Sequence, residues 1–462
     1  MNFDLFLISY TNSIEQTLKK IELNHLGFTL VQNEDKQIIG LVTDGDIRRN
    51  LLNGKNLNSL VSESMNREFI WASSTSPREQ LLKMLDSRIR FIPILDDVKQ
   101  LVGIVTKDEL PHLEERKVYA RARSPVRISF GGGGSDLTHF FTHEKGAVIN
   151  STVSIYTHST LRIRDDYRII LHSRDLNESI EFVDYDDLLK RNSNFKLFQS
   201  IIKVARPSFG FELFVHSDYP MNSGLGGSAV VSSAILGCFN QFRKDKWDNH
   251  EIAELAFQAE RLDLGIAGGW QDQYATVFGG FNFMEFAMDQ NIVHPLRLSK
   301  DTMIELEESL VLCDTATTHD SGNIHDDQRE SMKQSDIKLR VQSNVELTYE
   351  MRNHLLRGRL LQFGKCLHKA WKIKRELSSK ISNNFLDKIY EDAISHGAIG
   401  GKLLGAGGGG FFLFYVPPFA KHNLLNWMES SGLRYRPFRF DSEGLQAWTV
   451  REELLKEDLT IL

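Results

Sequence analysis

A short glycine-rich stretch, PMNSGLGGSAVVSSA at residues 220–234, combines residue types that suit anion binding. Gly224, Gly226 and Gly227 permit positive φ and close approach to the backbone, and the small residues after Ser228 predict a buried helix. The free N–H groups and the dipole at the start of such a helix favour a phosphate group. A surface turn would explain the glycines equally well, so this cluster alone does not establish a site.

Two further glycine-rich segments occur, at 131–134 and 405–410. The first follows a predicted strand in SPVRISFGGGGSD, and the second lies between two apolar, strand-like runs in GGKLLGAGGGGFFLFYV. GAGGGG matches GxGxxG, but a dinucleotide fingerprint needs a helix after the glycines, and FFLFYV predicts a strand. The Walker A and protein-kinase signatures do not match either. The three loops therefore belong to none of these classes.

The first 110 residues contain an internal repeat. FTLVQNEDKQIIGLVTDGDI, from Phe28, aligns without gaps with FIPILDDVKQLVGIVTKDEL, from Phe91. Each copy predicts a helix, a strand, an acidic turn, a second strand and a short helix, and two copies can bury one shared face. The repeat resembles a tandem CBS domain pair over residues 1–113. A charged linker or short bridging helix is expected at 111–122.

The CBS resemblance implies an adenine-nucleotide site. Its ribose contacts would be Thr43 and Asp46 in the first copy and Thr106 in the second, where Glu109 takes the place of the aspartate. A threonine at a strand end can equally cap the next helix. An adenine nucleotide is thus a candidate ligand of the CBS pair, which is also a candidate element for forming a homodimer.

From residue 118 onward the order of motifs resembles the GHMP kinase family of small-molecule kinases. PMNSGLGGSA is similar to its phosphate loop, SPVRISFGGGGSD to its first motif and GGKLLGAGGGGFF to its C-terminal glycine motif. The resemblance implies an α+β fold, with a ribosomal-protein-S5-like N-terminal subdomain at 118–300 and a ferredoxin-like C-terminal subdomain at 301–462. Within the family, these motifs and GWQDQYATVFGG are most similar to D-glycero-D-manno-heptose 7-phosphate kinases, which phosphorylate the anomeric hydroxyl.

The same resemblance assigns roles to individual side chains. Asp272 matches the catalytic aspartate, and Arg127 matches an arginine suited to charge on the transferred phosphoryl group. An ion pair between Arg127 and Asp136 is the structural alternative. Ser228 and Glu260 match the Mg²⁺ ligands, because this cation prefers alcohol and carboxylate oxygens. A plain helix N-cap is the alternative for Ser228, and a solvated charge is the alternative for each acid.

Two sets of binding residues follow from the matched motifs. The nucleotide set is Pro220, Asn222, Gly224, Leu225, Gly226, Gly227, Ser228 and Ala229. The substrate set is Gly133, Gly134, Ser135, Asp136, Gly269, Gln271, Gly407 and Gly408. A polar segment from residue 315 adds His319, Ser321, His325 and Arg329 as residues that could reach a sugar phosphate, with inert surface histidines as the alternative.

Composition limits the other classes of function. A chain of 462 residues is too long for a single hydrophobic core, so more than one domain is expected. The net charge of −6 argues against a dedicated nucleic-acid or polybasic membrane binder. Three widely spaced cysteines suit a reducing cytosol and provide no metal-site spacing. No apolar run has the ~18 residues of a membrane span, and the N-terminus lacks the basic region of a signal peptide. A cytoplasmic protein is expected.

The favoured interpretation is an ATP- and Mg²⁺-dependent kinase of a sugar or sugar phosphate, with the anomeric hydroxyl of D-glycero-D-manno-heptose 7-phosphate as the expected acceptor. The resemblance implies that this activity feeds the synthesis of nucleotide-activated heptose for surface polysaccharide. One alternative is another GHMP kinase, such as a fucokinase or galactokinase. A second alternative is a nucleotide-sensing regulator with an inactive kinase half, although such a protein would not need Ser228, Glu260 and Asp272 together.

Overall fold

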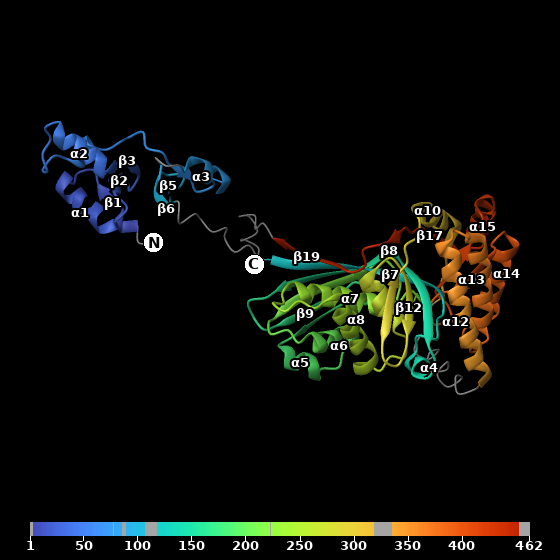
Figure 1. Ribbon diagram of the computed structural model, residues 1–462. Coiled ribbons are helices and arrows are strands. Elements are labelled where there is room, and N and C mark those ends of the chain that lie inside the picture. The colour runs from blue at the N-terminus through green and yellow to red at the C-terminus, as the bar shows by residue number, and fades with distance from the viewer. Residues whose placement is uncertain are drawn as a thin grey trace. The chain divides into compact units, whose positions relative to one another are not determined.

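The chain divides into two compact units, Met1–Arg116 and Lys117–Leu462. The computed structural model describes residues 3–76, 78–85, 89–106, 118–221, 223–317 and 335–451. Among the described helices, none combines the length and the hydropathy of a membrane-spanning segment. Figure 1 shows the order of the elements along the chain.

The first unit contains two similar three-stranded sheets (Figure 1). Each sheet has a central strand with one parallel and one antiparallel neighbour: β2 (Phe28–Gln32) between β1 (Leu7–Ser9) and β3 (Ile38–Thr43), and β5 (Phe91–Leu95) between β4 (Ala72–Ser73) and β6 (Leu101–Thr106). The described helices of this unit are α1 (Ile14–Asn24), α2 (Asp44–Leu52) and α3 (Arg78–Met84), with 3₁₀ turns at Phe3–Leu5 and Val61–Glu63. The predicted repeat of strand, acidic turn and strand is confirmed.

The two repeats bury a common face, as the sequence predicts. The rings of Phe28 and Phe91 stack with centroids 3.5 Å apart, and Leu30, Leu95 and Ile104 complete the same apolar cluster. Polar contacts also join the copies, because the backbone N–H of Ile38 donates to the carbonyl oxygen of Lys99 at 2.9 Å. The unit therefore has a core that neither copy could form alone.

A nine-stranded sheet dominates the second unit. Its long strands β7 (Val118–Gly131) and β8 (Gly146–Ile163) pair antiparallel. The remaining strands are β9 (Ile169–Ser173), β10 (Glu178–Phe182), β11 (Phe211–Ser217), β12 (Phe281–Phe286), β13 (Asn291–Pro295), β18 (Phe440–Asp441) and β19 (Gln446–Arg451). β18 pairs with β8 and β19 with β7, so the segment predicted as the C-terminal subdomain also supplies strands to this first sheet.

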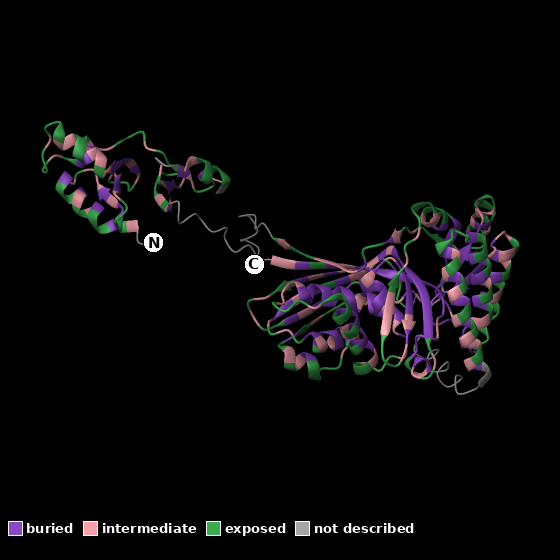
Figure 2. Ribbon diagram, viewed as in Figure 1, coloured by how far each residue is buried: buried purple, intermediate pink, exposed green. Residues whose placement is uncertain are grey.

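Helices cover one face of the large sheet, which buries an apolar cluster beneath them (Figures 1 and 2). They are α4 (Thr138–Phe141), α5 (Tyr185–Lys190), α6 (Lys196–Ala205), α7 (Gly227–Gln241), α8 (Asn249–Phe257) and α9 (Gln271–Phe278), with a π-helical turn at Gln258–Asp263. Helix α7 is almost entirely buried, because its sequence GSAVVSSAILGCFNQ carries small and apolar residues on every side.

A second, four-stranded antiparallel sheet has the order β15-β16-β14-β17, with β14 (Leu310–Asp314), β15 (Gly400–Leu403), β16 (Phe411–Tyr415) and β17 (Arg434–Arg436). The helices of this half are α10 (Lys300–Ser309), α12 (Ser335–Leu356), α13 (Leu360–Arg375), α14 (Asn384–Ser395) and α15 (Pro418–Ser430). Apolar side chains of α10, α12 and α13 pack with those of β7, β8 and β12, and Phe130 of β7 meets Phe363 of α13 edge to face at 5.3 Å. The α+β fold is confirmed, and the two sheets share a core.

The ring stack in the first unit leads to a stability prediction. Phe28→Ala removes a fully buried ring and should destabilise the unit by ~3–5 kcal/mol. Because Phe91 of the other repeat loses its partner, hydrogen exchange should also accelerate in β5 and β6. Trp71→Ala, at a 41% exposed aromatic side chain, is the control and should change stability little. Normal protection of β5 and β6 in Phe28→Ala would show that the repeats fold independently.

Candidate functional site

The glycine loop before α7 has the backbone that its sequence predicts. Gly226 is the N-cap of α7 with φ +82°, and Gly224 has φ +78°, a conformation that strains other residues. At Gly224 an added Cβ would lie 2.7 Å from the carbonyl oxygen of Leu404. Gly405 packs directly against Gly224, so the glycine loops near 224 and 405 touch although 180 residues separate them. Only glycine allows this approach.

Arg127 joins this loop to Asp272. The Arg127 side chain is almost fully buried, and its Nε donates to Asp272 Oδ1 at 2.7 Å. Its Nη1 donates to the carbonyl oxygen of Gly224 at 2.8 Å, and its backbone N–H donates to that of Leu225. The alternative prediction of an ion pair with Asp136 is wrong, because the guanidinium of Arg127 faces Asp272 instead. Asp272, in the first turn of α9, is thereby held beside the phosphate-loop sequence.

Ser228 and Glu260 lie against each other at the start of α7. The Ser228 hydroxyl donates to Glu260 Oε2, and Gln273 Nε2 donates to Glu260 Oε1 at 3.1 Å. Complete burial raises the pKa of the Glu260 carboxyl. Ser228 is the second residue of α7 rather than its N-cap, so the capping alternative is wrong. An alcohol and a carboxylate oxygen adjoining a helix N-terminus fit a hard divalent cation such as Mg²⁺.

Glu260 reaches this position from a π-helical turn, Gln258–Asp263, that continues α8. The wider turn adds a residue to the helical path, and such turns are frequent at functional sites. The next residue, Arg261, donates to the carbonyl oxygens of Ile266 and Ala267, both at 3.3 Å. This contact ties the chain after the turn to the segment that leads into α9.

Asp136 is buried beside the start of α9. Its Oδ1 accepts from the Gly134 N–H at 3.1 Å, and its Oδ2 accepts from Gln271 Nε2 at 3.0 Å. Burial, and secondarily the charge of Asp272, raises the pKa of Asp136. Gly269 is required here, because an added Cβ would overlap the Asp136 carboxylate.

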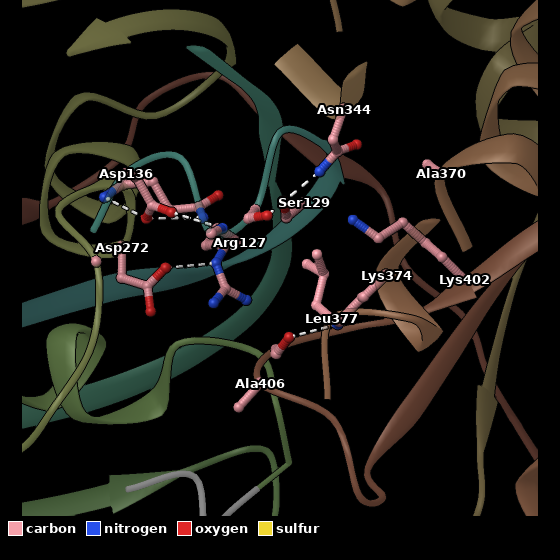
Figure 3. A pocket seen from close by; sticks show the side chains of 15 residues that line it. Arg127, Ser129, Asp136, Asp272, Asn344, Ala370, Lys374, Leu377, Lys402 and Ala406 are labelled. Carbon is pink, nitrogen blue, oxygen red and sulfur yellow. Dashed lines mark hydrogen bonds and ion pairs between the residues drawn. The ribbon is translucent and has the colours of Figure 1, made fainter. Parts of the chain in front are cut away.

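Two cavities meet at Arg127 and Asp272. The loop cavity, of about 470 Å³, is bordered by the glycine loop and Ser228 and by apolar side chains that include Leu176, Leu197, Phe198 and Val231. The polar cavity is bordered by Asp136, Gly133, Gly134, Gly269, Gln271, Ser129, Asn344, Lys374 and Lys402. Both cavities also share Gly405 and Ala406. Figure 3 shows Asp136, Asp272 and Arg127 on one side of the polar cavity and Lys374 and Lys402 on the other.

Some predicted residues support the site without lining either cavity. The Ser135 hydroxyl donates to the carbonyl oxygens of Gly132 and Ala147, and Gly408 N–H donates to that of Ile381. Gly407 also packs on Ile381. The residues of this loop that line the cavities are Gly405 and Ala406. Leu225 and Ala229 are core residues, and Pro220 is exposed. Asn222, His319, Ser321, His325 and Arg329 lie outside the described residues.

The motif search missed Ser129, Asn344, Lys374 and Lys402, which line the polar cavity. Lys374 and Asn344 lie on the helices α13 and α12, whose sequences contain no glycine-rich motif. For Lys402 a signal existed, because a lysine inside the strand sequence GGKLL is unusual for a buried strand.

In the first unit, Thr43 and Asp46 form a reciprocal cap of α2. Thr43 Oγ1 donates to Asp46 Oδ2 at 2.7 Å and accepts from the Asp46 N–H at 3.2 Å, while Arg49 pairs with Asp46 Oδ1. The capping alternative is therefore present in this structure. Thr106 ends β6, and Glu109 lies outside the described residues.

Sequence profiles agree with this arrangement. The profile of the GHMP kinases N terminal domain matches residues 193–280, that of the GHMP kinases C terminal domain matches 351–425, and CBS domain profiles match 1–53 and 61–111. The chain is similar to a D-glycero-alpha-D-manno-heptose 7-phosphate kinase of Campylobacter jejuni, with 34% identity over 71% of this chain and 99% of that protein.

Two more distant similarities each cover about two thirds of the chain or more. The L-fucokinase/L-fucose-1-P guanylyltransferase of Bacteroides fragilis is 28% identical over 67% of this chain, which spans only 36% of that longer protein. The crystal structure of a D-glycero-D-manno-heptose 1-phosphate kinase from Bacteroides thetaiotaomicron superposes with a TM-score of 0.60 at 26% identity, covering 72% of this chain and 100% of that one.

The buried carboxyl of Asp136 leads to a pH prediction. The pKa of Asp136 is raised above its ordinary value near 3.8, so the ionised carboxylate destabilises the folded state. This loss of stability develops as the pH rises from 3.8 through the pKa that Asp136 has in the folded protein. Asp136→Asn should therefore melt at an equal or higher temperature than the wild type at pH 7, with the difference shrinking toward pH 4. Gln271 Oε1 is buried and has no hydrogen-bond partner in the described part of the chain, so it can accept from the new amide after a side-chain flip.

The measurement is the melting temperature between pH 4 and 8. Asp289→Asn, at an exposed turn, is the control and should show no such trend. If Asp136→Asn were less stable than the wild type, and if this difference grew with pH, the ionised carboxylate would stabilise the folded state and the prediction would be wrong.

Proposed function

The chain belongs to the GHMP kinase family, its similarity to sugar kinases makes it an ATP-dependent sugar kinase, and we propose that it phosphorylates the anomeric hydroxyl of D-glycero-D-manno-heptose 7-phosphate. The observation that carries the proposal is the position of Asp272 and Arg127 at the meeting point of the loop cavity and the polar cavity. The 34% identity to a heptose 7-phosphate kinase over most of the chain supports the choice of sugar. The product would enter the synthesis of nucleotide-activated heptose for surface polysaccharide.

The loop cavity suits the nucleotide. Backbone N–H groups after Gly224 and the N-terminus of α7 provide a cradle for the triphosphate, and Leu197, Phe198 and Val231 offer apolar contacts for the base. Ser228 and Glu260 would hold Mg²⁺, which neutralises phosphate charge when it is bound. The three described cysteines are free and buried, and together with the use of ATP this supports a cytoplasmic location.

The polar cavity suits the acceptor sugar. The Asp136 carboxylate can accept hydrogen bonds from sugar hydroxyls at a place where it already accepts from Gly134 and Gln271. Asp272 would orient the attacking hydroxyl and receive its proton while the sugar oxygen bonds to the γ-phosphorus and ADP leaves. Arg127 fixes Asp272 through Nε, and its remaining N–H groups can stabilise charge on the phosphoryl group.

A screen of acceptors by ADP release tests this function. The acceptors to compare are D-glycero-D-manno-heptose 7-phosphate, fucose, galactose and mevalonate. The heptose 7-phosphate should give the highest kcat/KM of the four. Fucose is the second candidate, because a relative carries an L-fucokinase activity in its name. If the enzyme preferred a neutral sugar, that sugar would take the place of heptose 7-phosphate as the proposed acceptor. If no acceptor supported ADP release, the regulator interpretation would be favoured.

We also propose that the CBS pair binds an adenine nucleotide. Such a ligand would have to compete for the Asp46 carboxylate, which Thr43 and Arg49 occupy in this structure. Calorimetry of the full chain with AMP, under conditions that saturate the kinase site with an ATP analogue, tests the proposal, and the absence of any binding heat would refute it. Sedimentation of the same samples would reveal a homodimer.

Asp272→Asn should lower kcat by ~10²–10⁴-fold, because an amide cannot receive the hydroxyl proton. The amide oxygen can still accept from Arg127 Nε, so the loop should keep its geometry and the affinity for ATP should stay near that of the wild type. Steady-state kinetics and nucleotide titration are the measurements, with Asp289→Asn as the control. Turnover near the wild-type rate would remove Asp272 from proton transfer.

Ser228→Ala should shift the Mg²⁺ dependence of activity to higher concentration by weakening the binding of MgATP. The matched control is Ser232→Ala, one turn further along α7, where the buried hydroxyl has no hydrogen-bond partner among the described residues. Titration of activity with MgCl₂ at fixed ATP distinguishes the variants. Superimposable curves for Ser228→Ala and the wild type would contradict a role of this hydroxyl in holding the cation.

A further inference from the structure

Lys402 is a buried lysine that has no hydrogen-bond partner among the described residues. It lies on β15 and is 4% exposed, and within the described part of the chain its ammonium group makes no hydrogen bond or ion pair. The nearby Lys374 differs, because its Nζ donates to the carbonyl oxygens of Leu403 at 2.8 Å and Gly405 at 2.6 Å. Lys374 therefore supports the glycine loop, whereas Figure 3 shows the Lys402 side chain reaching into the cavity toward Ser129 and Asn344.

Two charged groups act on Lys402. Arg127, itself paired with Asp272, repels the ammonium group, and the Asp136 carboxylate attracts it. Burial lowers the pKa of the nearby Lys374 well below its ordinary value. Burial, together with Arg127, lowers the pKa of Lys402 to about 7. An unpaired buried charge costs folding free energy, so this arrangement is unfavourable in the ligand-free protein.

Two polar atoms in the same cavity also lack partners. Ser129 Oγ and Asn344 Oδ1 are buried without a hydrogen bond to any described residue. The Ser129 hydroxyl is free to donate beside the Lys402 ammonium, and the Asn344 oxygen can accept from a ligand hydroxyl. A cation, a free hydroxyl donor and an acceptor together match a phosphate group carried by a polyhydroxylated molecule.

We propose that Lys402 and Ser129 bind the phosphate group that the acceptor sugar already carries, with Asn344 accepting from an adjacent sugar hydroxyl. The inference rests on the proposed function, since it assigns the specificity for a phosphorylated acceptor to these side chains. Lys402 lines the polar cavity with Asp136 and not the loop cavity with Ser228, so its phosphate is that of the sugar rather than the γ-phosphate of ATP.

The test compares Lys402→Met with the wild type on D-glycero-D-manno-heptose 7-phosphate and on the same heptose without its phosphate. Loss of a charge-assisted hydrogen bond should raise KM for the phosphorylated sugar by about 10- to 100-fold. KM for the neutral heptose and for ATP should change less than threefold. Lys372→Met, at an exposed lysine of α13, is the control and should keep both values. The melting temperature of ligand-free Lys402→Met should be equal to or higher than that of the wild type, because the variant no longer buries an unpaired charge.

The outcomes separate the two proposals. If the wild type itself shows no preference for the phosphorylated heptose, the proposed acceptor and this subsite both fail. If the wild type prefers it and Lys402→Met keeps that preference, only the subsite is overturned. A rise in KM confined to ATP would place Lys402 on the nucleotide instead. A lower melting temperature with a uniform loss of activity on both sugars would assign Lys402 a structural role.

Discussion

The close approach of two glycine-rich loops is the constraint on which the catalytic arrangement depends. Gly224 and Gly405 pack against each other where any side chain would collide with backbone, and Arg127 then donates to the carbonyl oxygen of Gly224 and to Asp272. These contacts set the helix N-terminus of α7 beside the carboxylate that would receive the proton. Because phosphoryl transfer depends chiefly on positioning and electrostatics, this packing supplies much of what the chemistry requires.

The site also holds charges under conditions that disfavour them. Burial raises the pKa values of Glu260 and Asp136 and lowers that of Lys402, so each group is shifted toward its neutral form in the ligand-free protein. The apolar clusters beneath the large sheet and between the two sheets carry the stability that offsets this cost. A bound metal ion would supply a counter-charge for Glu260 and a phosphate group would supply one for Lys402, so binding would offset part of this cost.

In the CBS unit, one sequence motif is compatible with two roles, a helix cap and a ribose site. Thr43 and Asp46 cap α2 as any Thr-x-x-Asp pair could, and the same side chains match a ribose site. Their hydrogen bonds satisfy the helix terminus without a ligand, so a nucleotide at this place would gain only the difference between its own contacts and the cap that it would displace. The shared ring stack of Phe28 and Phe91 joins the two repeats in one core.

The sequence alone determined the repeat, the strand before each glycine loop and the buried helix after Gly226, because these depend on local periodicity and on residues close together in the chain. The candidates Asp272, Glu260 and Ser228 came from the resemblance of their motifs to the GHMP kinase family. Tertiary structure decided the rest. The partner of Arg127, the return of β18 and β19 to the first sheet, and the convergence of Lys402 and Asn344 on one cavity join segments far apart in sequence. Local patterns carry no information about such contacts, since they arise only when separate apolar faces bury one another.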